Sequence, residues 1–403
     1  MKAIELFAGG GGLALGTKAA GFDHAAVVEY DRNSCDTIRE NNRRGVVDWP
    51  IYQGDVREFD FKPYEGVDLV AGGPPCQPFS IGGKHRGHSD HRNLFPEAVR
   101  AVRETMPRAV LIENVKGLLR PAFNSFFEYV ILQLTYPELT IKANEEWQKH
   151  HERLERHHTR GRNKSGLHYQ VVWNRINAAD FGVPQKRERV FIVAFRSDIA
   201  ARWAFPQPTH SHAALLRSQW ITGEYWDRHK ITKRKRPPMP TITDRRLEQL
   251  EAGDGLESWL TVRDAISDLP DPTKGRNKIP NHVHNPGART YKGHTGSPLD
   301  VPAKTLKAGD HGVPGGENML AYPSGDVRYF TVRESARLQT FPDNFIFAGS
   351  WTETMRQLGN AVPVSIAAKI ATNIRESLAT ERRREGRNAI QPTGQGSSRR
   401  KRS

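Results

Sequence analysis

The sequence predicts an α/β protein with a doubly wound, mostly parallel, Rossmann-like sheet and a second, smaller, irregular domain. Short apolar segments recur through residues 1–198 and alternate with segments whose apolar residues have helical spacing. The first apolar segment leads into the glycine run Gly9–Gly12 and then into a helical pattern, which is how such folds begin. Several apolar segments end in an acidic residue, and ligands of these folds bind at the carboxyl ends of strands.

The expected strands follow one another from the N-terminus, with helices between them. They span residues 3–7, 25–29, 51–55, 67–71, 109–113, 169–173 and 190–195. A helix is expected from Leu13 to Ala20, and Asp31 can cap a second helix that runs toward Arg43. The residues at or just past strand ends are Phe7, Glu29, Asp55, Cys76 and Glu113. We expect them to share one edge of the sheet and one binding crevice.

The glycine run favours a particular kind of cofactor. No Gly-Lys-Ser or Gly-Lys-Thr follows it, so it is not a P-loop, and no Lys or Arg is placed in the turn to meet a pyrophosphate. Glycines allow the close approach of a nucleotide-like ligand, and Glu29 can accept hydrogen bonds from ribose hydroxyls. A cofactor with adenosine but no phosphate therefore suits the turn better than a dinucleotide does.

Cys76 is one of only two cysteines in the chain. It follows the strand at 67–71 on a turn that contains Pro74, Pro75 and Pro78. Proline fixes φ, so such a turn can hold one side chain out into a cleft. A thiolate held in this way is a nucleophile, whereas the alternative is a small buried cysteine beside a proline-rich loop.

Composition limits the class of protein. The 403 residues carry a formal net charge of +15, which fits a polyanionic partner, with general solubility as the alternative. The length favours two domains. Cys35 and Cys76 have no CxxC spacing, so neither a disulfide framework nor a cysteine-based zinc site is expected, and a reducing cytoplasm fits. We expect no signal peptide, and no membrane span, because no apolar run approaches about 18 residues.

Six motifs occur in a fixed order along the chain. They are Phe7–Gly11 (FAGGG), Pro74–Cys76 (PPC), Glu113–Val115 (ENV), Gln185–Arg189 (QKRER), Arg333–Gln339 (RESARLQ) and Gln357–Asn360 (QLGN). As an ordered set they resemble the bacterial DNA (cytosine-5) methyltransferases that use S-adenosylmethionine. The resemblance covers about residues 3–198 and 328–378, and it implies the S-adenosylmethionine methyltransferase fold.

The resemblance implies a thiol mechanism. Carbon 5 of cytosine is a poor nucleophile, and a thiolate that adds to carbon 6 makes carbon 5 reactive. By resemblance the catalytic residues are Cys76, Glu113, Arg187 and Arg189. Cys76 attacks carbon 6, Glu113 protonates or hydrogen-bonds ring nitrogen 3, and Arg189 meets the exocyclic oxygen. Arg187 is expected close to the thiol, and Asn114 is expected to help hold the loop.

The cofactor pocket also follows from the resemblance. The implied S-adenosylmethionine contacts are Phe7, Ala8, Gly9, Gly10, Glu29, Tyr30, Asp55, Val56, Pro75, Leu94, Asn360 and Ala361. Phe7 would stack on adenine, Tyr30 would flank it, and Asp55 would accept from its amino group. The family often has serine where Ala361 stands, and plain packing is the alternative for Pro75 and Leu94. The product is S-adenosylhomocysteine, and no metal is expected.

The resemblance names double-stranded DNA as the partner. A target base must be flipped out of the duplex before a thiol can reach it. The glycine-rich, basic stretch 79–93 corresponds to a loop that closes on DNA in the family, with Ser80, Lys84 and Arg86 able to meet phosphates. Thr305 is a further DNA-binding candidate, since it corresponds to a threonine that contacts backbone in the family.

The domain organisation follows. Residues 1–198 are expected to be the catalytic domain, with a charged helical insertion at about 138–168 that is a solvated surface element or a DNA contact. Residues 199–327 are expected to recognise the target, with the basic run Lys233–Arg236 on phosphates. His210 and His212 are a zinc site or an exposed loop pair. Residues 328–380 return to the catalytic domain through a helix at 362–378, and 381–403 form a basic, disordered tail.

The predicted function is methylation of a cytosine at carbon 5 in a short DNA sequence, as in a restriction–modification system. A cognate endonuclease acting separately, a monomeric state and a cytoplasmic, nucleoid-associated location are further expectations. The alternatives are an RNA cytosine-5 methyltransferase and a DNA-binding relative without catalysis. The long stretch 199–327 favours DNA, and the intact set of catalytic candidates favours an enzyme.

Overall fold

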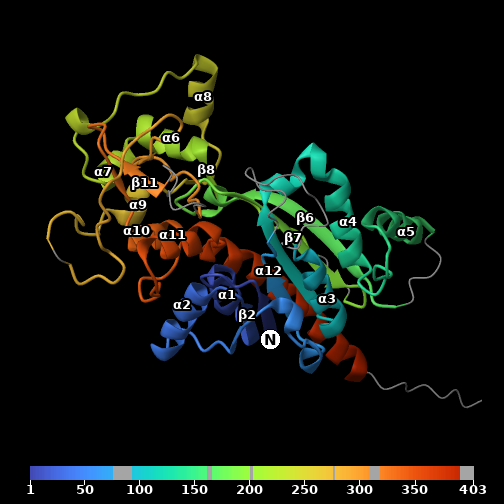
Figure 1. Ribbon diagram of the computed structural model, residues 1–403. Coiled ribbons are helices and arrows are strands. Elements are labelled where there is room, and N and C mark those ends of the chain that lie inside the picture. The colour runs from blue at the N-terminus through green and yellow to red at the C-terminus, as the bar shows by residue number, and fades with distance from the viewer. Residues whose placement is uncertain (76–92, 161–165, 200–202, 276, 309–317, 391–403) are drawn as a thin grey trace, which may run out of the picture.

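The computed structural model (Figure 1) describes residues 1–75, 93–160, 166–199, 203–275, 277–308 and 318–390. Its strands are β1 Lys2–Leu6, β2 Asp23–Glu29, β3 Ile51–Gln53, β4 Leu69–Gly72, β5 Ala109–Val115, β6 Tyr169–Asn177, β7 Glu188–Arg196, β8 His210–Ser211, β9 Glu257–Ser258, β10 Ser297–Pro298, β11 Met319–Ala321 and β12 Val327–Tyr329. Its α-helices are α1 Gly12–Ala19, α2 Arg32–Arg43, α3 Phe95–Thr105, α4 Asn124–Thr135, α5 Trp147–Arg160, α6 His212–Trp220, α7 Glu224–Arg228, α8 Asp244–Ala252, α9 Val262–Ile266, α10 Val332–Leu338, α11 Trp351–Asn360 and α12 Val364–Ile390. None of the helices in the described ranges is long and apolar enough to cross a membrane.

A seven-stranded sheet forms the centre of the molecule. Its order is β3-β2-β1-β4-β5-β7-β6, and the neighbours from β3 to β5 are parallel. Strand β7 runs antiparallel to both β5 and β6. The predicted doubly wound, mostly parallel sheet is therefore confirmed. The order of strands reverses between β1 and β4, and such a switch point is where ligands bind in open α/β sheets.

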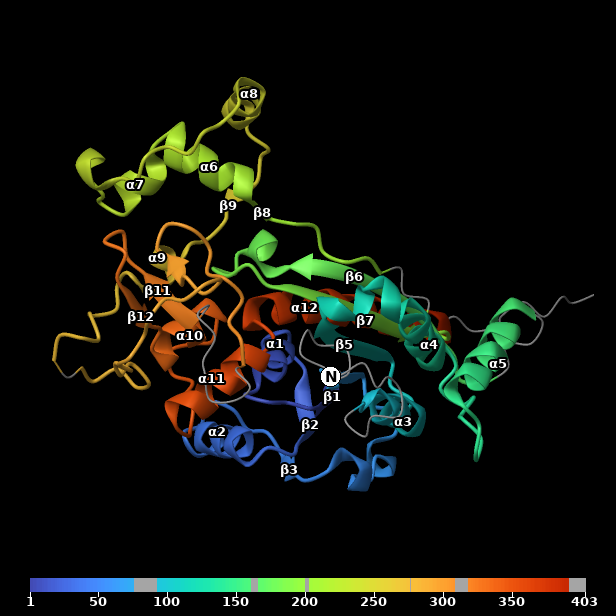
Figure 2. The ribbon, with the colours of Figure 1, turned by 45° about the horizontal axis from the view of Figure 1, so that its top comes forward.

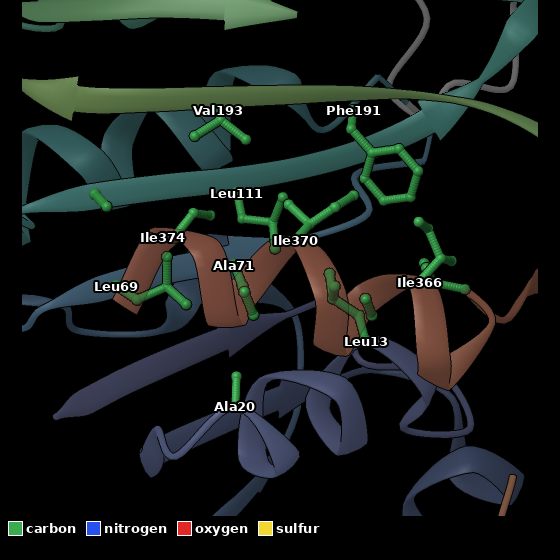
Figure 3. Packing of buried hydrophobic residues seen from close by; sticks show 14 of the residues in the cluster. Leu13, Ala20, Leu69, Ala71, Leu111, Phe191, Val193, Ile366, Ile370 and Ile374 are labelled. Atoms are coloured by element: carbon green, nitrogen blue, oxygen red, sulfur yellow. The ribbon is translucent and has the colours of Figure 1, made fainter. Parts of the chain in front are cut away.

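One face of the sheet is covered by α1 and α12. Figure 3 shows side chains of β4, β5 and β7 meeting side chains of these two helices. The members labelled there are Leu13, Ala20, Leu69, Ala71, Leu111, Phe191, Val193, Ile366, Ile370 and Ile374. The strand members within each strand are two residues apart, as expected for one face of a sheet. The C-terminal helix thus returns to the catalytic domain, as the resemblance implies, and it packs against the first helix of the chain.

The opposite face is covered by α3 and α4. Val110 and Ile112 of β5 point into a second cluster that contains Phe95 of α3 and Tyr129 of α4. Because Leu111 points to the first cluster, β5 is buried on both faces. This burial explains why its sequence is a continuous apolar run rather than an alternating one.

Several expected boundaries are wrong. Strand β3 ends at Gln53, so Asp55 lies two residues past it, and β5 continues to Val115, so Glu113 lies inside the strand. Helix α12 runs to Ile390, ten residues into the tail that was expected to be disordered from residue 381. Glu381 is buried, which ties this segment to the rest of the protein. The expected α2 is confirmed, with the Asp31 carboxylate capping it at the Ser34 N–H.

The elements between β7 and α10 stand beside the large sheet in both views (Figures 1 and 2). They include the parallel pair β8–β9 and the three-stranded sheet β10-β11-β12. Asp300 joins them, since its carboxylate accepts from Tyr225 Oη at 2.8 Å and from Arg263 Nε at 2.6 Å. The Asp300 carbonyl also accepts from Gln219 at 2.7 Å. This region therefore has its own buried polar centre.

Candidate active site

The glycine turn after β1 is held by one carboxylate. Glu29, the last residue of β2, accepts from the Gly9 N–H at 2.6 Å, the Tyr30 N–H at 2.9 Å and the Asp31 N–H at 2.7 Å. Phe7 has φ of 56° and Gly9 has φ of 53°, so the chain turns sharply there. A Cβ on Gly9 would meet nothing within 4 Å among the residues that the structure describes. The turn thus leaves room for a ligand beside an anchored backbone.

The other cofactor candidates lie around this turn to different degrees. Phe7 and Leu94 pack against the same apolar cluster, which contains buried Val56. Ala8 and Ala361 share a second cluster beside the turn. A Cβ on Gly10 would lie 3.1 Å from the Phe347 ring, so Gly10 is closed in from that side.

Four further candidates are exposed, partly buried or paired with another residue. The Tyr30 side chain is 75% exposed, and no described neighbour fixes its ring against a pocket wall. The Asp55 carboxylate accepts from the Arg57 N–H and pairs with Arg57 Nη1, each at 2.9 Å. Asn360 is exposed at the end of α11, and Pro75 is partly buried at the edge of the described residues.

The turn fits S-adenosylmethionine. It contains no Lys or Arg between Phe7 and Gly12, so it offers no cation for a phosphate. A carboxylate has about four lone-pair sites, and three of those on Glu29 are used by backbone N–H groups. At least one site is left for a ribose hydroxyl. Burial raises the pKa of Glu29, while the three N–H donors lower it in part.

Glu113 and Arg189 form a buried ion pair beyond the switch point. Arg189 Nε lies 2.9 Å from Glu113 Oε1. The register explains the contact: Glu113 is opposite Phe191 and Val115 is opposite Arg189, so the two side chains are diagonal neighbours on one face of the sheet. A Cβ on Gly73 would lie 3.3 Å from Glu113 Oε2. The carboxyl is therefore next to the start of the Pro-Pro-Cys segment.

The electrostatics of this pair favour a protonatable carboxyl. Burial raises the pKa of Glu113 more than the cations Arg189 and Arg187 lower it. Burial lowers the pKa of both arginines, yet arginine starts so high that it keeps its charge. Glu113 is therefore positioned to hold a proton at higher pH than an exposed glutamate.

Asn114 braces the same segment. Its Nδ2 donates to the Pro74 carbonyl at 3.0 Å, and its Oδ1 accepts from the Val115 N–H at 2.8 Å. The expectation that Asn114 helps hold the loop is confirmed at Pro74. Cys76, Ser80, Lys84 and Arg86 lie outside the described residues.

Cys35, the other cysteine, is an unsuitable nucleophile. It is fully buried in α2, and its Sγ donates to the Glu29 carbonyl at 3.6 Å. Burial, together with the nearby Glu29 charge, raises the pKa of this thiol to about 12. A thiol with such a pKa stays protonated near neutral pH.

Arg187 joins three segments that are far apart in sequence. It lies just before β7 and is 0% exposed. Its guanidinium donates to the Leu306 carbonyl at 3.2 Å and to the Gly359 carbonyl at 2.7 Å. A Cβ on Gly359 would lie 2.2 Å from Ala308 N, so only glycine permits this close approach. Arg187 thus links the QKRER and QLGN motifs to the segment around Leu306.

Gln185 makes a second link that sequence reasoning did not single out. Its Oε1 accepts from the Leu306 N–H at 3.0 Å, and its Nε2 donates to the Leu338 carbonyl at 3.3 Å. Thr305 Oγ1 donates to the Lys186 carbonyl at 2.6 Å, so the threonine contacts protein backbone. The only signal for Gln185 in the sequence was its place as the first residue of QKRER.

The two histidines considered for zinc do not form a pair. His210 Nε2 lies 3.3 Å from Glu257 Oε2, whereas the His212 ring stacks on Trp259 with centroids 5.0 Å apart. His210 lies in β8, where it is half-buried, and His212 is the first residue of α6, so the two side chains have separate partners and the expected exposed loop pair is wrong as well.

Comparisons with known proteins show the family of the chain. The family model for C-5 cytosine-specific DNA methylase matches residues 1–138 and 149–376. The chain is 30% identical to the type II methyltransferase M.NgoMIV of Neisseria gonorrhoeae over 94% of this chain and 98% of that protein. It is 31% identical to M.Eco47II of Escherichia coli over 92% of this chain and 78% of that protein.

Solved structures show the same fold. One is a candidate DNA modification methyltransferase encoded in an Escherichia coli prophage, with a TM-score of 0.56, 23% identity and coverage of 94% of this chain and 99% of that one. Another is the Dnmt2 methyltransferase of Schizosaccharomyces pombe, with a TM-score of 0.56, 16% identity and the same coverage. The family match extends over both the sheet and the segments that return to it. The chain therefore belongs to the C-5 cytosine-specific DNA methylase family and is a DNA cytosine methyltransferase that uses S-adenosylmethionine.

Proposed function

We propose that the enzyme methylates carbon 5 of a flipped cytosine within a specific short duplex sequence, through a covalent bond between Cys76 and carbon 6. The observation that carries this proposal is the buried Glu113–Arg189 pair beside Gly73, three residues before Cys76. A cation and a protonatable carboxyl beside the segment that leads into Cys76 in the sequence match the needs of a pyrimidine ring that gains charge at nitrogen 3. The alternative nucleophile, Cys35, is buried and protonated.

In this mechanism each catalytic residue has a separate role. The Cys76 thiolate adds to carbon 6 while Glu113 donates a proton or hydrogen bond to nitrogen 3. Arg189 holds the exocyclic oxygen and orients the Glu113 carboxyl. Arg187 fixes the backbone around Leu306 and Gly359 and adds positive charge near the thiol. S-adenosylmethionine supplies an electrophilic methyl group. After carbon 5 is methylated, a base removes its proton and the Cys76 thiolate leaves.

The cofactor residues divide by what they contact. Glu29 anchors the glycine turn and offers its remaining lone pair to a ribose hydroxyl. Phe7, Val56 and Leu94 line one apolar wall, while Ala8 and Ala361 line another. Tyr30, Asp55, Pro75 and Asn360 complete the pocket when the cofactor binds. The Asp55 carboxylate, which is paired with Arg57, would then accept a hydrogen bond from the adenine amino group either in addition to Arg57 or in place of it.

Residues 199–327 recognise the target sequence in this proposal. They have their own buried polar centre at Asp300, and the Lys233–Lys235 turn is exposed. Hydrogen bonds from Gln185, Arg187 and Thr305 tie the 305–306 segment to the QKRER motif. Recognition of a base sequence is thereby linked to the residues that hold the target base.

The biological setting is proposed from the relatives. M.NgoMIV and M.Eco47II are named type II methyltransferases, the class that modifies the sites of restriction enzymes. We infer that this enzyme is the modification half of such a system, acts as a monomer and has an endonuclease partner that works separately on the same site.

Bisulfite sequencing tests activity and target together. DNA from cells that express the wild-type chain should show protected cytosines at one recurring sequence. The Cys76→Ala variant should show none, whereas Cys35→Ala should keep the pattern. A trapped complex with DNA that contains 5-fluorocytosine should map to Cys76 by mass spectrometry, because fluorine at carbon 5 blocks the elimination. Turnover by Cys76→Ala, or an adduct on another residue, would refute the mechanism.

A further inference from the structure

A cavity of about 910 Å³ lies between α4, α5 and the edge strand β6. Its apolar wall includes Phe127, Ile131 and Trp173, and its polar wall includes Glu128 and Glu155. Both views place α5 at the opposite end of the molecule from α6, α7 and α8 (Figures 1 and 2). None of the catalytic or cofactor candidates that the structure describes lines the cavity, so the proposed function leaves it unexplained.

Glu128 and Glu155 of the polar wall lie close to a third side chain with a metal-binding atom, His151, which does not itself line the cavity. Glu128 comes from α4, while His151 and Glu155 are four residues apart on α5 and so share one face of that helix. The three ligand atoms all lie within 4.8 Å of one another. Ligand atoms that lie about 2.1 Å from a tetrahedral zinc ion are about 3.4 Å apart. Small side-chain rotations of the two exposed glutamates would bring the three ligand atoms to this spacing.

The buried histidine is the observation that points to a ligand. His151 is only 9% exposed, and its Nε2 is buried without a hydrogen-bond partner in the described part of the chain. This nitrogen lies 3.7 Å from Glu155 Oε1, too far for a hydrogen bond. Trp147 stacks on the ring with centroids 6.3 Å apart. The ring is thus packed on its face and leaves a buried nitrogen that a cation between it and the carboxylates would satisfy.

The two carboxylates also lack an arginine or lysine partner in the described part of the chain, although Arg156 lines the same cavity. Among residues 93–160 and 166–199, no Lys or Arg is within ion-pair distance of Glu128 or Glu155. The neighbouring Glu145 is different, because Arg153 pairs with it at 2.8 Å. Two carboxylates and one neutral imidazole balance the charge of a divalent cation.

We propose that Glu128, His151 and Glu155 bind a first-row divalent metal ion of the zinc type, which joins α5 to α4. An imidazole with two carboxylates selects zinc and similar ions over magnesium and calcium, which prefer all-oxygen sites. Three protein ligands leave a fourth coordination position for water or another small ligand. The exposed carboxylates give the ion a path from solvent. The site lies within the 138–168 insertion and its docking helix, so its role is distinct from catalysis.

Zinc titration of the full-length protein tests this site. After removal of metal with EDTA and dialysis, calorimetry should show one saturable site for ZnCl2, and the ion should raise the melting temperature. Cobalt(II) should give a visible absorption band that zinc abolishes. Glu128→Gln and Glu155→Gln change exposed side chains, so they should fold normally and lower zinc affinity at least about tenfold, as should His151→Gln.

A matched control separates the site from surface binding. Glu152 lies on the same helix and lines the same cavity but is outside the three-ligand group. Glu152→Gln should keep the zinc affinity and the cobalt spectrum of the wild type. The proposal is wrong if no saturable site exists, if the Glu128→Gln and Glu155→Gln variants bind zinc as the wild type does, or if Glu152→Gln loses affinity equally. All variants should retain methyl transfer, because none touches the candidate active site.

Discussion

Arg189 Nε lies 2.9 Å from Glu113 Oε1, across the antiparallel pair of strands β7 and β5. The contact joins the ENV and QKRER motifs, which are more than seventy residues apart in the chain but two positions apart in register. It also places a cation on a carboxyl whose pKa burial raises. The pair is thus a proton-holding site in which Arg189, and to a smaller extent Arg187, lowers the pKa of the carboxyl.

Glu113→Gln should lower the rate of methyl transfer by roughly 10²- to 10⁴-fold, the range for loss of a general acid. Glutamine keeps the shape and a hydrogen-bond donor but cannot deliver a proton. In the wild type, activity should fall as pH rises through the raised pKa of Glu113, since the carboxyl then loses its proton. Single-turnover rates across pH measure both effects. A glutamine variant with the wild-type rate and the same alkaline limb would remove Glu113 from the mechanism.

Arg189→Gln should move the alkaline limb of the pH–rate profile, where activity falls as Glu113 loses its proton, to higher pH. Arg189 lowers the pKa of Glu113, so its removal leaves the carboxyl protonated over a wider range. The rate itself should fall, because the exocyclic oxygen loses its partner. Arg189→Lys, which keeps the charge, should leave the limb nearer its wild-type position. An unchanged limb in Arg189→Gln would show that the limb reports another group.

Glu29→Gln should weaken binding of S-adenosylhomocysteine by roughly tenfold to a hundredfold. In the wild type, three backbone N–H groups donate to the two oxygens of the Glu29 carboxylate. The amide of the variant has only one acceptor oxygen, and its NH2 group would face N–H donors that it cannot accept from. Each lost charge-assisted hydrogen bond costs about 1.5–3 kcal/mol. Calorimetry measures the affinity, with the exposed Glu58→Gln as control. Wild-type affinity in Glu29→Gln would mean that the turn holds its shape without the carboxylate.

The sequence was most informative where local chemistry decides the structure. The sequence predicted a strand followed by a glycine turn, with Glu29 at the end of the next strand, from residues close together in the chain. The structure contains this strand and turn, with Glu29 bonded to the turn at Gly9. The antiparallel placement of β7 was not predicted, because apolar runs do not carry strand direction. The connection between β6 and β7, residues 178–187, does indicate the direction of β7. It is too short for a parallel crossover, which needs a dozen residues or more.

Other features depend on contacts that no local pattern reveals. Arg187 and Gln185 lie in a charged run, and from the sequence alone such a run is expected to face solvent. In the structure both side chains are fully buried and hydrogen-bonded to backbone groups of residues 306, 338 and 359. The continuation of β5 past Glu113 depends on its pairing with β7. His151 is similar, because its burial arises from the packing of α5 on α4.

Replacement of Lys233, Arg234 and Lys235 by alanine should weaken DNA binding without changing cofactor affinity. These three side chains are exposed on one short turn of the 199–327 region. If all three neutralise phosphates, the slope of log affinity against log salt should fall by roughly two to three. Lys149→Ala, on α5 at the other end of the molecule, is the control. An unchanged salt slope would place the DNA on another face.

Gly16→Ala should destabilise the protein, although alanine is the better helix former. In an open helix position the change gains about 0.5–1 kcal/mol. Here a Cβ on Gly16 would lie 2.3 Å from the Ala367 Cβ and 2.8 Å from the Ala368 backbone nitrogen, so α1 and α12 would have to separate. Overpacking of this kind costs about 1–3 kcal/mol, which outweighs the helical gain. The melting temperature should therefore fall, whereas Ala19→Ser on the exposed side of α1 should change it little. A Gly16→Ala variant that melts higher than the wild type would mean that α12 is held less tightly against α1 than the structure has it.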